Sequence, residues 1–152
     1  MLNDNEMKII SHLRQNSRQS LIDIARKTDI PLSTIYDKIK THGQTTIKKF
    51  TSIVDFPALG FNIRATVFAK GKQKRLGEFL MTNPNINSLF RLGGDYDYCA
   101  DCVFRYMSEM NDFMERLEEL SDKKEAHFVT QELRREDFLN PVRIEKTTKE
   151  VM

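Results

Sequence analysis

The chain of 152 residues is long enough for one or two small domains, and its 39% hydrophobic and 30% charged residues are typical of a globular protein. No run approaches the roughly 20 apolar residues of a membrane span, and residues 1–6 lack the pattern of a secretory signal, so we expect a soluble, cytoplasmic protein without a membrane partner. Two cysteines in such a chain argue against a disulfide scaffold.

The net charge of +2 is distributed unevenly along the chain. Residues 1–50 carry nine Lys/Arg against five Asp/Glu, whereas residues 51–152 carry 15 against 17. A basic first part and a slightly acidic second part predict two units with different partners.

Apolar residues at helical spacing predict two short helices within the first 30 residues. Asn3 and Ser20 each precede such a run, and both residue types cap helices by accepting hydrogen bonds from the first turn. The apolar residues at this spacing are Met7, Ile10 and Leu13 in the first helix. In the second, the residues expected to share one face are Leu21, Ile24, Ala25 and Thr28.

A third helix is predicted after Pro31, which disfavours helical geometry at the residue before it. Ser33 is the expected cap, and Ile35 and Ile39 lie one turn apart on the inward face. Helix, short turn and capped helix form a helix-turn-helix pattern. The β-branched segment 45–54 then suits a wing hairpin that leads into a connecting strand.

Strand and helix signals alternate through the rest of the chain. Strands are expected at 62–69, 86–92, 98–105 and 126–133, and helices at 72–83 and 107–120. This βαββαβ order is that of a ferredoxin-like domain, which makes the fold class α+β. Two helices cover one face of such a sheet, so we expect the other face to form a homodimer. The predicted organisation is a winged helix-turn-helix domain (1–50), a linker strand (51–61), a ferredoxin-like domain (62–133) and a charged tail (134–152). Within this tail, residues 142–144 either add an edge strand or belong to a flexible segment.

Three stretches together carry a family resemblance. They are the helix-turn-helix of residues 9–35, the linker Phe50-Thr-Ser-Ile-Val-Asp-Phe-Pro-Ala-Leu-Gly60, and the turn Gly94-Asp-Tyr-Asp-Tyr98. In this order the sequence resembles the Lrp/AsnC (leucine-responsive, feast/famine) family of transcription factors. The resemblance implies a DNA-binding head and a domain that dimerises, assembles further into tetramers or octamers, and often senses an amino acid near the glycine-aspartate turn. The segment after the third helix differs from the usual family pattern, because Gly43 comes early and His42 stands where leucine is usual.

The third helix and the predicted wing supply the candidate DNA contacts. Recognition helices read base edges through their outer, N-terminal residues, while lysines and hydroxyls hold phosphates. The alternative is an ordinary solvated helix with surface lysines. No arginine that could read guanine lies in the helix. The candidate residues are Ser33, Thr34, Tyr36, Asp37, Lys38 and Lys40 in the helix, and Thr45, Lys48 and Lys49 in the wing.

The glycine-aspartate turn is the candidate effector site. Two glycines permit positive φ and close backbone approach, exposed amides could hold a carboxylate, and an aspartate could hold an α-amino group. The alternative is a tight turn whose carboxylates accept from local amides while its tyrosines pack. The candidate effector-binding residues are Gly93, Gly94, Asp95, Tyr96, Asp97 and Tyr98.

No motif in the sequence calls for a cofactor, a metal ion or a catalytic group. Cys99 and Cys102 lie three apart in a predicted strand, which turns their thiols to opposite faces, and Cys102 suits the core. The leading function that the resemblance implies is a sequence-specific DNA-binding transcriptional regulator modulated by a small molecule of the amino-acid class, with double-stranded DNA and further copies of the chain as partners. The alternatives are a tetrapyrrole-processing enzyme of the same architecture, for which the three scattered histidines offer no site, and an architectural DNA-binding protein without an effector.

Overall fold

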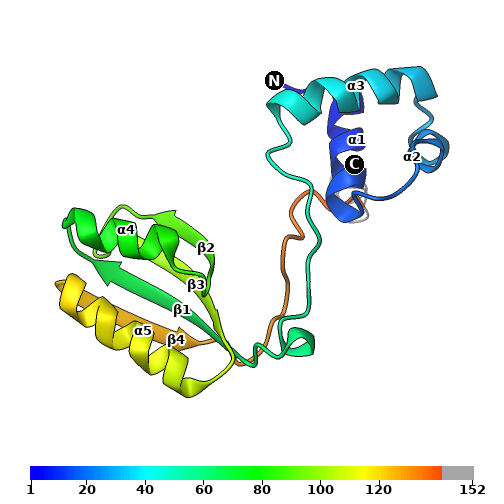
Figure 1. The fold of residues 1–152 in the computed structure, drawn as a ribbon. Coiled ribbons are helices and arrows are strands. Elements are labelled where there is room, and N and C mark those ends of the chain that lie inside the picture. Colours follow the sequence, from blue (N-terminus) through cyan, green and yellow to red (C-terminus); the bar gives the residue numbers. More distant parts are fainter. Residues whose placement is uncertain (142–152) are drawn as a thin grey trace, which may run out of the picture. The chain divides into compact units, whose positions relative to one another are not determined.

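The computed structural model describes residues 1–141, which form two compact units (Figure 1). Among the described residues, the first unit comprises residues 1–53 and 134–141, and the second comprises residues 54–133. None of the helices described in either unit is both long and apolar enough to cross a membrane.

The first unit is built from three helices whose beginnings the sequence marks. Asn3 caps α1 in a reciprocal capping box with Glu6, and the Ser20 hydroxyl caps α2 by accepting from the Asp23 amide at 3.0 Å. Both predicted caps are confirmed. The helices are α1 (Asp4–Gln15), α2 (Leu21–Thr28) and α3 (Leu32–Thr45), and their shared core is formed by Ile9, Leu13, Ile24, Ile30 and Ile35.

The turn between α2 and α3 is closed by Asp29. This residue takes a left-handed conformation with φ of 57° and donates its amide to the Ala25 carbonyl, while Ile30 is buried below it. The N-cap of α3 is Pro31, so the expectation that Ser33 caps this helix is wrong. Ser33 lies inside the first turn, because proline at the cap position fixes the entry of the chain two residues earlier.

The predicted strands after the helix-turn-helix are also wrong. Thr45 belongs to the last turn of α3, which continues through Gly43, and residues 47–55 form no strand; the expected linker strand contains instead a short 3-10 helix, η1 (Pro57–Leu59). The β-branched residues of this segment favour extended backbone, but no neighbouring strand among the described residues pairs with it.

The C-terminal segment packs within the first unit instead of forming a free tail. The Arg14 guanidinium on α1 binds the Glu136 carboxylate at 2.5 Å and donates from Nε to the Phe138 carbonyl at 3.2 Å. The edge strand considered for residues 142–144 lies outside the described residues.

The second unit is the predicted ferredoxin-like fold. Its elements are β1 (Ile63–Lys70), α4 (Lys74–Thr82), β2 (Ile86–Arg91), β3 (Tyr98–Phe104), α5 (Met107–Leu120) and β4 (Lys123–Phe128). The described strands form one antiparallel sheet in the order β2-β3-β1-β4, and α4 and α5 lie on the same side of it (Figure 1). β4 begins three residues earlier and ends five earlier than expected, because its register against β1 runs only from Lys123 to Phe128.

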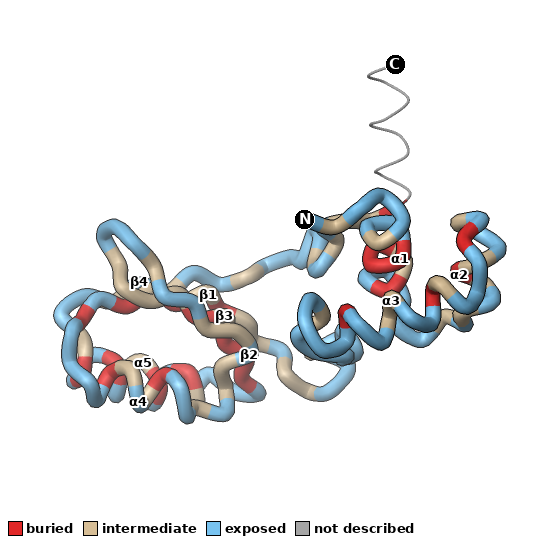
Figure 2. The backbone as a smooth tube through the Cα atoms, turned by 90° about the horizontal axis from the view of Figure 1, so that it is seen from above, coloured by how far each residue is buried: buried red, intermediate tan, exposed pale blue. Residues whose placement is uncertain are grey.

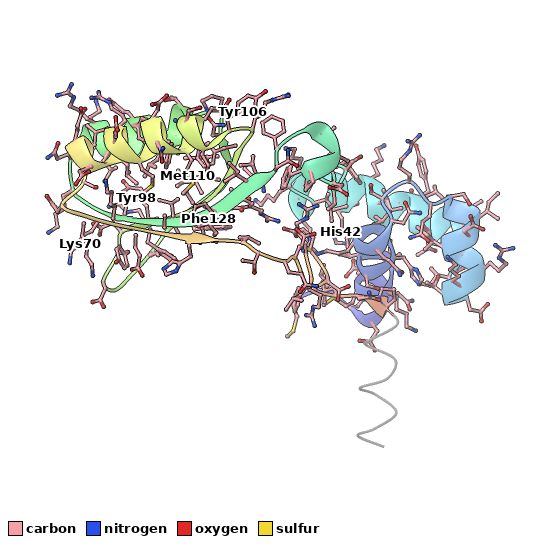
Figure 3. All side chains as sticks on the ribbon, turned by 90° about the horizontal axis from the view of Figure 1, so that it is seen from below. His42, Lys70, Tyr98, Tyr106, Met110 and Phe128 are labelled. Carbon is pink, nitrogen blue, oxygen red and sulfur yellow. The ribbon has the colours of Figure 1, made fainter. Side chains whose placement is uncertain are left out.

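The core of this unit lies between the sheet and the two helices, where Figure 2 shows the buried residues. Ala65, Val67 and Ala69 alternate along β1 toward the helices, as the period of two in the sequence predicts. Met110 from α5 is buried against the sheet (Figure 3), whereas Met107 at the start of the helix is half exposed.

Candidate nucleic-acid interface and effector turn

The outer side of α3 is the exposed side of the helix-turn-helix. Ile35 is fully buried, whereas Ser33, Tyr36, Asp37 and Lys40 are exposed. A rotation of 100° per residue brings these four to one side of the helix. Four of the six candidate residues predicted in this helix therefore share one solvent-facing surface.

Lys38 turns the other way, toward α1, and is held in an ion pair. Its Nζ lies 2.7 Å from Oε1 of Glu6, the side chain that also closes the capping box of α1. His42 is buried on the same side of α3 (Figure 3), with Nε2 at 3.6 Å from the same carboxylate and Nδ1 at 3.0 Å from the Thr46 hydroxyl. These contacts make Glu6 a clasp between α1 and α3.

The Glu6 clasp predicts an acid-sensitive contribution to stability. The hydrogen bond from Lys38, followed by the Asn3 amide, lowers the pKa of Glu6 from 4.5 to about 2. Because the folded-state pKa is the lower one, this contribution is complete above pH 4.5 and is lost as the pH falls toward 2. We expect Glu6→Gln to melt at a lower temperature than the wild type at neutral pH, with a difference that narrows on acidification.

Thermal melts followed by circular dichroism at neutral pH and at about pH 3 measure this difference. Comparing the two proteins at each pH cancels the other carboxylates of the chain. A gap in melting temperature that stays constant between the two conditions would contradict the role of the ionised Glu6.

An apolar hollow lies between the N-terminal ends of α2 and α3. It has a volume of about 590 Å³, and large apolar side chains at its rim are exposed: Ile22 by 68%, Leu32 by 46% and Tyr36 by 58%. The remaining lining residues are Ser20, Leu21, Ser33 and Asp37.

The remaining candidate DNA contacts follow α3 or lie on its flank. Lys48 and Lys49 are exposed in the irregular segment after the helix, where a hairpin was expected, and Thr45 is exposed in its last turn. Thr34 is half-buried. Within residues 1–141, no carboxylate lies within ion-pair distance of Lys40, Lys48 or Lys49, in contrast to Lys38.

In the second unit, the turn between β2 and β3 is fixed by Asp97. Its amide donates to the Ala69 carbonyl at 3.0 Å, its carbonyl accepts from Leu92 at 2.8 Å, and its carboxylate accepts from the Gly71 amide at 2.9 Å. Asp97 therefore stabilises the turn. Gly94 has a φ of 113°, a backbone conformation that glycine adopts readily and other residues rarely do. Both Gly94 and Asp95 are exposed.

The two tyrosines of the turn have different environments. The Tyr96 hydroxyl donates to Glu125 of β4 at 2.5 Å, which lowers the pKa of Glu125, and the Lys123 ammonium lies 4.6 Å from the Tyr96 ring centroid. Tyr98 packs against the core and accepts from Arg91 at 2.9 Å. Of the candidate effector residues, Gly93, Gly94 and Asp95 remain accessible.

The sheet face away from the helices carries a charged cluster in which Arg64 is paired with both Asp101 and Glu132. Arg64 of β1 donates from two nitrogens to the Asp101 carboxylate of β3, at 2.7 and 2.8 Å, which raises the pKa of Arg64. Phe68 and Phe90 lie on the same face, by the alternation of β1 and by register with Cys99. This face combines aromatic surface with paired charges.

Both cysteines occur as free thiols. Cys102 is buried in the core, as predicted, and burial raises its pKa to about 12, while Cys99 is partly exposed. The described residues contain no group of three or more His, Cys, Asp or Glu side chains placed to hold a metal ion.

A helix-turn-helix unit with an exposed second helix, joined to a ferredoxin-like unit, defines a class of DNA-binding regulators with a sensory domain. Comparison with known proteins agrees. The winged helix-turn-helix DNA-binding family model matches residues 2–41, and that of the Lrp/AsnC ligand binding domain matches residues 62–137. The chain belongs to the Lrp/AsnC family of transcriptional regulators.

One curated relative supports the same family, and two solved structures share the fold. The HTH-type transcriptional regulator FL11 of Pyrococcus furiosus is 30% identical over 131 residues, which covers 84% of this chain and 87% of FL11. The structure of Bacillus subtilis LrpC superposes with a TM-score of 0.80 at 22% identity, covering 88% of this chain and 98% of LrpC. A Neisseria meningitidis regulator in complex with L-methionine superposes with a TM-score of 0.78 at 17% identity, covering 89% and 94%.

The resemblance and the fold class expected from the sequence are thereby confirmed. The relatives are described as transcriptional regulators, so the protein is a DNA-binding regulator and the enzyme alternative is rejected.

Two parts of the first unit escaped sequence analysis. The Asn3-x-x-Glu6 spacing of a capping box is visible in the sequence and could have indicated that Glu6 is engaged. The Arg14–Glu136 contact joins residues 122 apart, and no local pattern announces it.

Proposed function

We propose that the protein binds specific duplex DNA sites through α3 and that an amino acid bound near the turn of residues 93–98 modulates its assembly or its affinity for DNA. The observation that carries the first part is the solvent-facing surface of α3, with Lys40, Lys48 and Lys49 free of carboxylate partners within the described chain. We place this function in the cytoplasm, as expected of a protein that binds the chromosome.

The effector part rests on what the turn leaves accessible. Asp97 is used by the fold, so Asp95 is the carboxylate available to an α-amino group, and the exposed glycine backbone beside it can approach a carboxylate. The similar Neisseria meningitidis regulator was solved with L-methionine, which supports an amino acid as the ligand class.

A homodimer through the open sheet face completes the proposal, with tetramers or octamers as further assemblies. Phe68 and Phe90 supply apolar area on that face, and the Arg64 guanidinium is paired with the carboxylates of Asp101 and Glu132. Two copies would present two α3 helices to the two halves of one DNA site.

Addition of the twenty amino acids, singly at millimolar concentration, tests the effector part. We expect at least one to raise the melting temperature, since a ligand at 100 times its Kd stabilises the folded state by about 2.7 kcal/mol. Asp95→Asn should remove the shift because it removes the charge partner of the α-amino group. Light scattering on the same samples should give at least a dimer mass.

Asp122→Asn is the matched control, since Asp122 is also an exposed aspartate of the second unit and its loss changes the net charge equally. A shift that survives Asp95→Asn would place the ligand elsewhere. No shift, no change of mass and no change in DNA affinity with any amino acid would contradict an amino-acid effector. The DNA-binding part fails separately if the full chain does not bind duplex DNA at low salt.

A further inference from the structure

The apolar hollow between α2 and α3 is unusual for a surface that meets a polyanion. Ile22, Leu32 and Tyr36 expose their side chains side by side within a unit whose residues 1–50 carry a net positive charge. Scattered exposed apolar residues need no explanation, but a cluster that rims one hollow indicates a contact surface.

The hollow lies where a helix-turn-helix meets base edges. The second helix of this motif enters the major groove with its N-terminal residues against the bases. Leu32 is the first residue of α3 and Tyr36 lies one turn further on, followed by Lys40 on the next turn. A base edge at the N-terminal end of α3 would therefore meet apolar surface first.

The side chains present favour one base over the others. Guanine is most often read by a bidentate arginine or lysine, but α3 contains no arginine and its Lys38 is paired with Glu6. The other lysine of α3, Lys40, lies two turns beyond Leu32 and does not line the hollow. Thymine is the base that presents an apolar group in the major groove, its C5-methyl, and apolar side chains read it by contact.

Resting on the proposed DNA-binding function, we propose that the Ile22–Leu32–Tyr36 hollow reads thymine C5-methyl groups and so directs the protein to sites with thymine at fixed positions. The lysines at 40, 48 and 49 then hold phosphates and add affinity without sequence preference. The hollow excludes water from the methyl, which is the source of the discrimination.

The test begins with a duplex that the full chain selects from a pool of random sequences. Each thymine of this duplex is replaced singly by deoxyuridine, which removes only the methyl group, and the affinity is measured by fluorescence anisotropy. We expect one or two positions in each copy of the recognised sequence where the substitution weakens binding about fourfold, the effect of one buried methyl-sized group.

The side chains are tested with Leu32→Ser and Tyr36→Ser. Each substitution is combined with the replacement of thymine by deoxyuridine in the duplex, which makes a double-mutant cycle. Both residues are about half exposed, so we expect both variants to keep their helical circular dichroism. At least one of the two variants should have the same affinity for the duplex with thymine at the sensitive position as for the duplex with uracil there. The salt dependence should not change, because no charge is removed. Met7→Ser is the control, since Met7 is an exposed apolar residue of α1 and its loss should leave the methyl effect intact.

The possible outcomes distinguish a failure of this inference from a failure of the proposed DNA-binding function on which it rests. If the wild type binds its selected duplex but every uracil duplex binds equally well, the hollow does not read methyl groups and only this inference is overturned. The same holds if the methyl effect persists in both variants, including the case in which they alter the assembly mass and so assign the hollow to a protein interface. Failure of the wild type to bind any duplex overturns the proposed function together with the inference.

Discussion

Phe104→Ala should lower the free energy of unfolding of the second unit by about 3–5 kcal/mol, the cost of removing a large buried aromatic side chain. Phe104 is fully buried at the end of β3, and its ring centroid lies 5.5 Å from that of Phe113 on α5. The side chain therefore joins the sheet to a helix. Since small domains are stable by only about 5–15 kcal/mol, this variant should be close to unfolding at 37 °C.

Urea unfolding followed by tyrosine fluorescence measures this loss selectively, because three of the four tyrosines, at positions 96, 98 and 106, lie in the second unit. Tyr106→Ala is the control: its side chain is 66% exposed, so the expected change is within about 0.5 kcal/mol. For this variant the transition is followed by circular dichroism. If Phe104→Ala unfolded at the same urea concentration as the wild type, the described packing of β3 against α5 would be wrong.

Replacing Lys40, Lys48 and Lys49 together by alanine should weaken duplex binding about a hundredfold at physiological salt and reduce the slope of log affinity against log salt by about 2.7, or 0.9 for each lost phosphate contact. The three ammonium groups are exposed and have no carboxylate partner within residues 1–141, so they are available to phosphates. Binding isotherms at several salt concentrations give both quantities.

The matched control is the triple alanine variant at Lys70, Lys72 and Lys74, three exposed lysines of the second unit. It changes the net charge by the same amount, so an equal loss of affinity would show a general charge effect and not a contact. Lys38→Ala differs from these substitutions, because Lys38 has a carboxylate partner. It breaks the pair with Glu6, so we expect it to act on the stability of the first unit as well as on DNA binding.

The parts of the fold that depend on local chemistry were predictable. Asn3 and Ser20 cap their helices as their residue types indicate, and the alternation along β1 identifies the buried face of the sheet. The segment 45–54 failed because strand propensity reflects the presence of a pairing neighbour, which a single sequence does not reveal.

In the candidate site too, the features that depend on local sequence were predictable and the contacts between distant residues were not. Helical periodicity correctly separates the buried Ile35 from the exposed Tyr36 and Lys40. It does not show that Lys38 is paired with Glu6, 32 residues away, or that Asp97 is occupied by the Gly71 amide. Contacts between distant residues decide which candidate side chains remain available to a ligand.

The placement of residues 134–141 has a consequence for the order in which the molecule is completed. The N-terminal unit is discontinuous in the chain, since Arg14 binds Glu136, 122 residues later. During translation its three helices emerge first, but their last packing contacts wait until the whole ferredoxin-like unit has been synthesised. The helix-turn-helix unit is thus synthesised before the ferredoxin-like unit but completed after it.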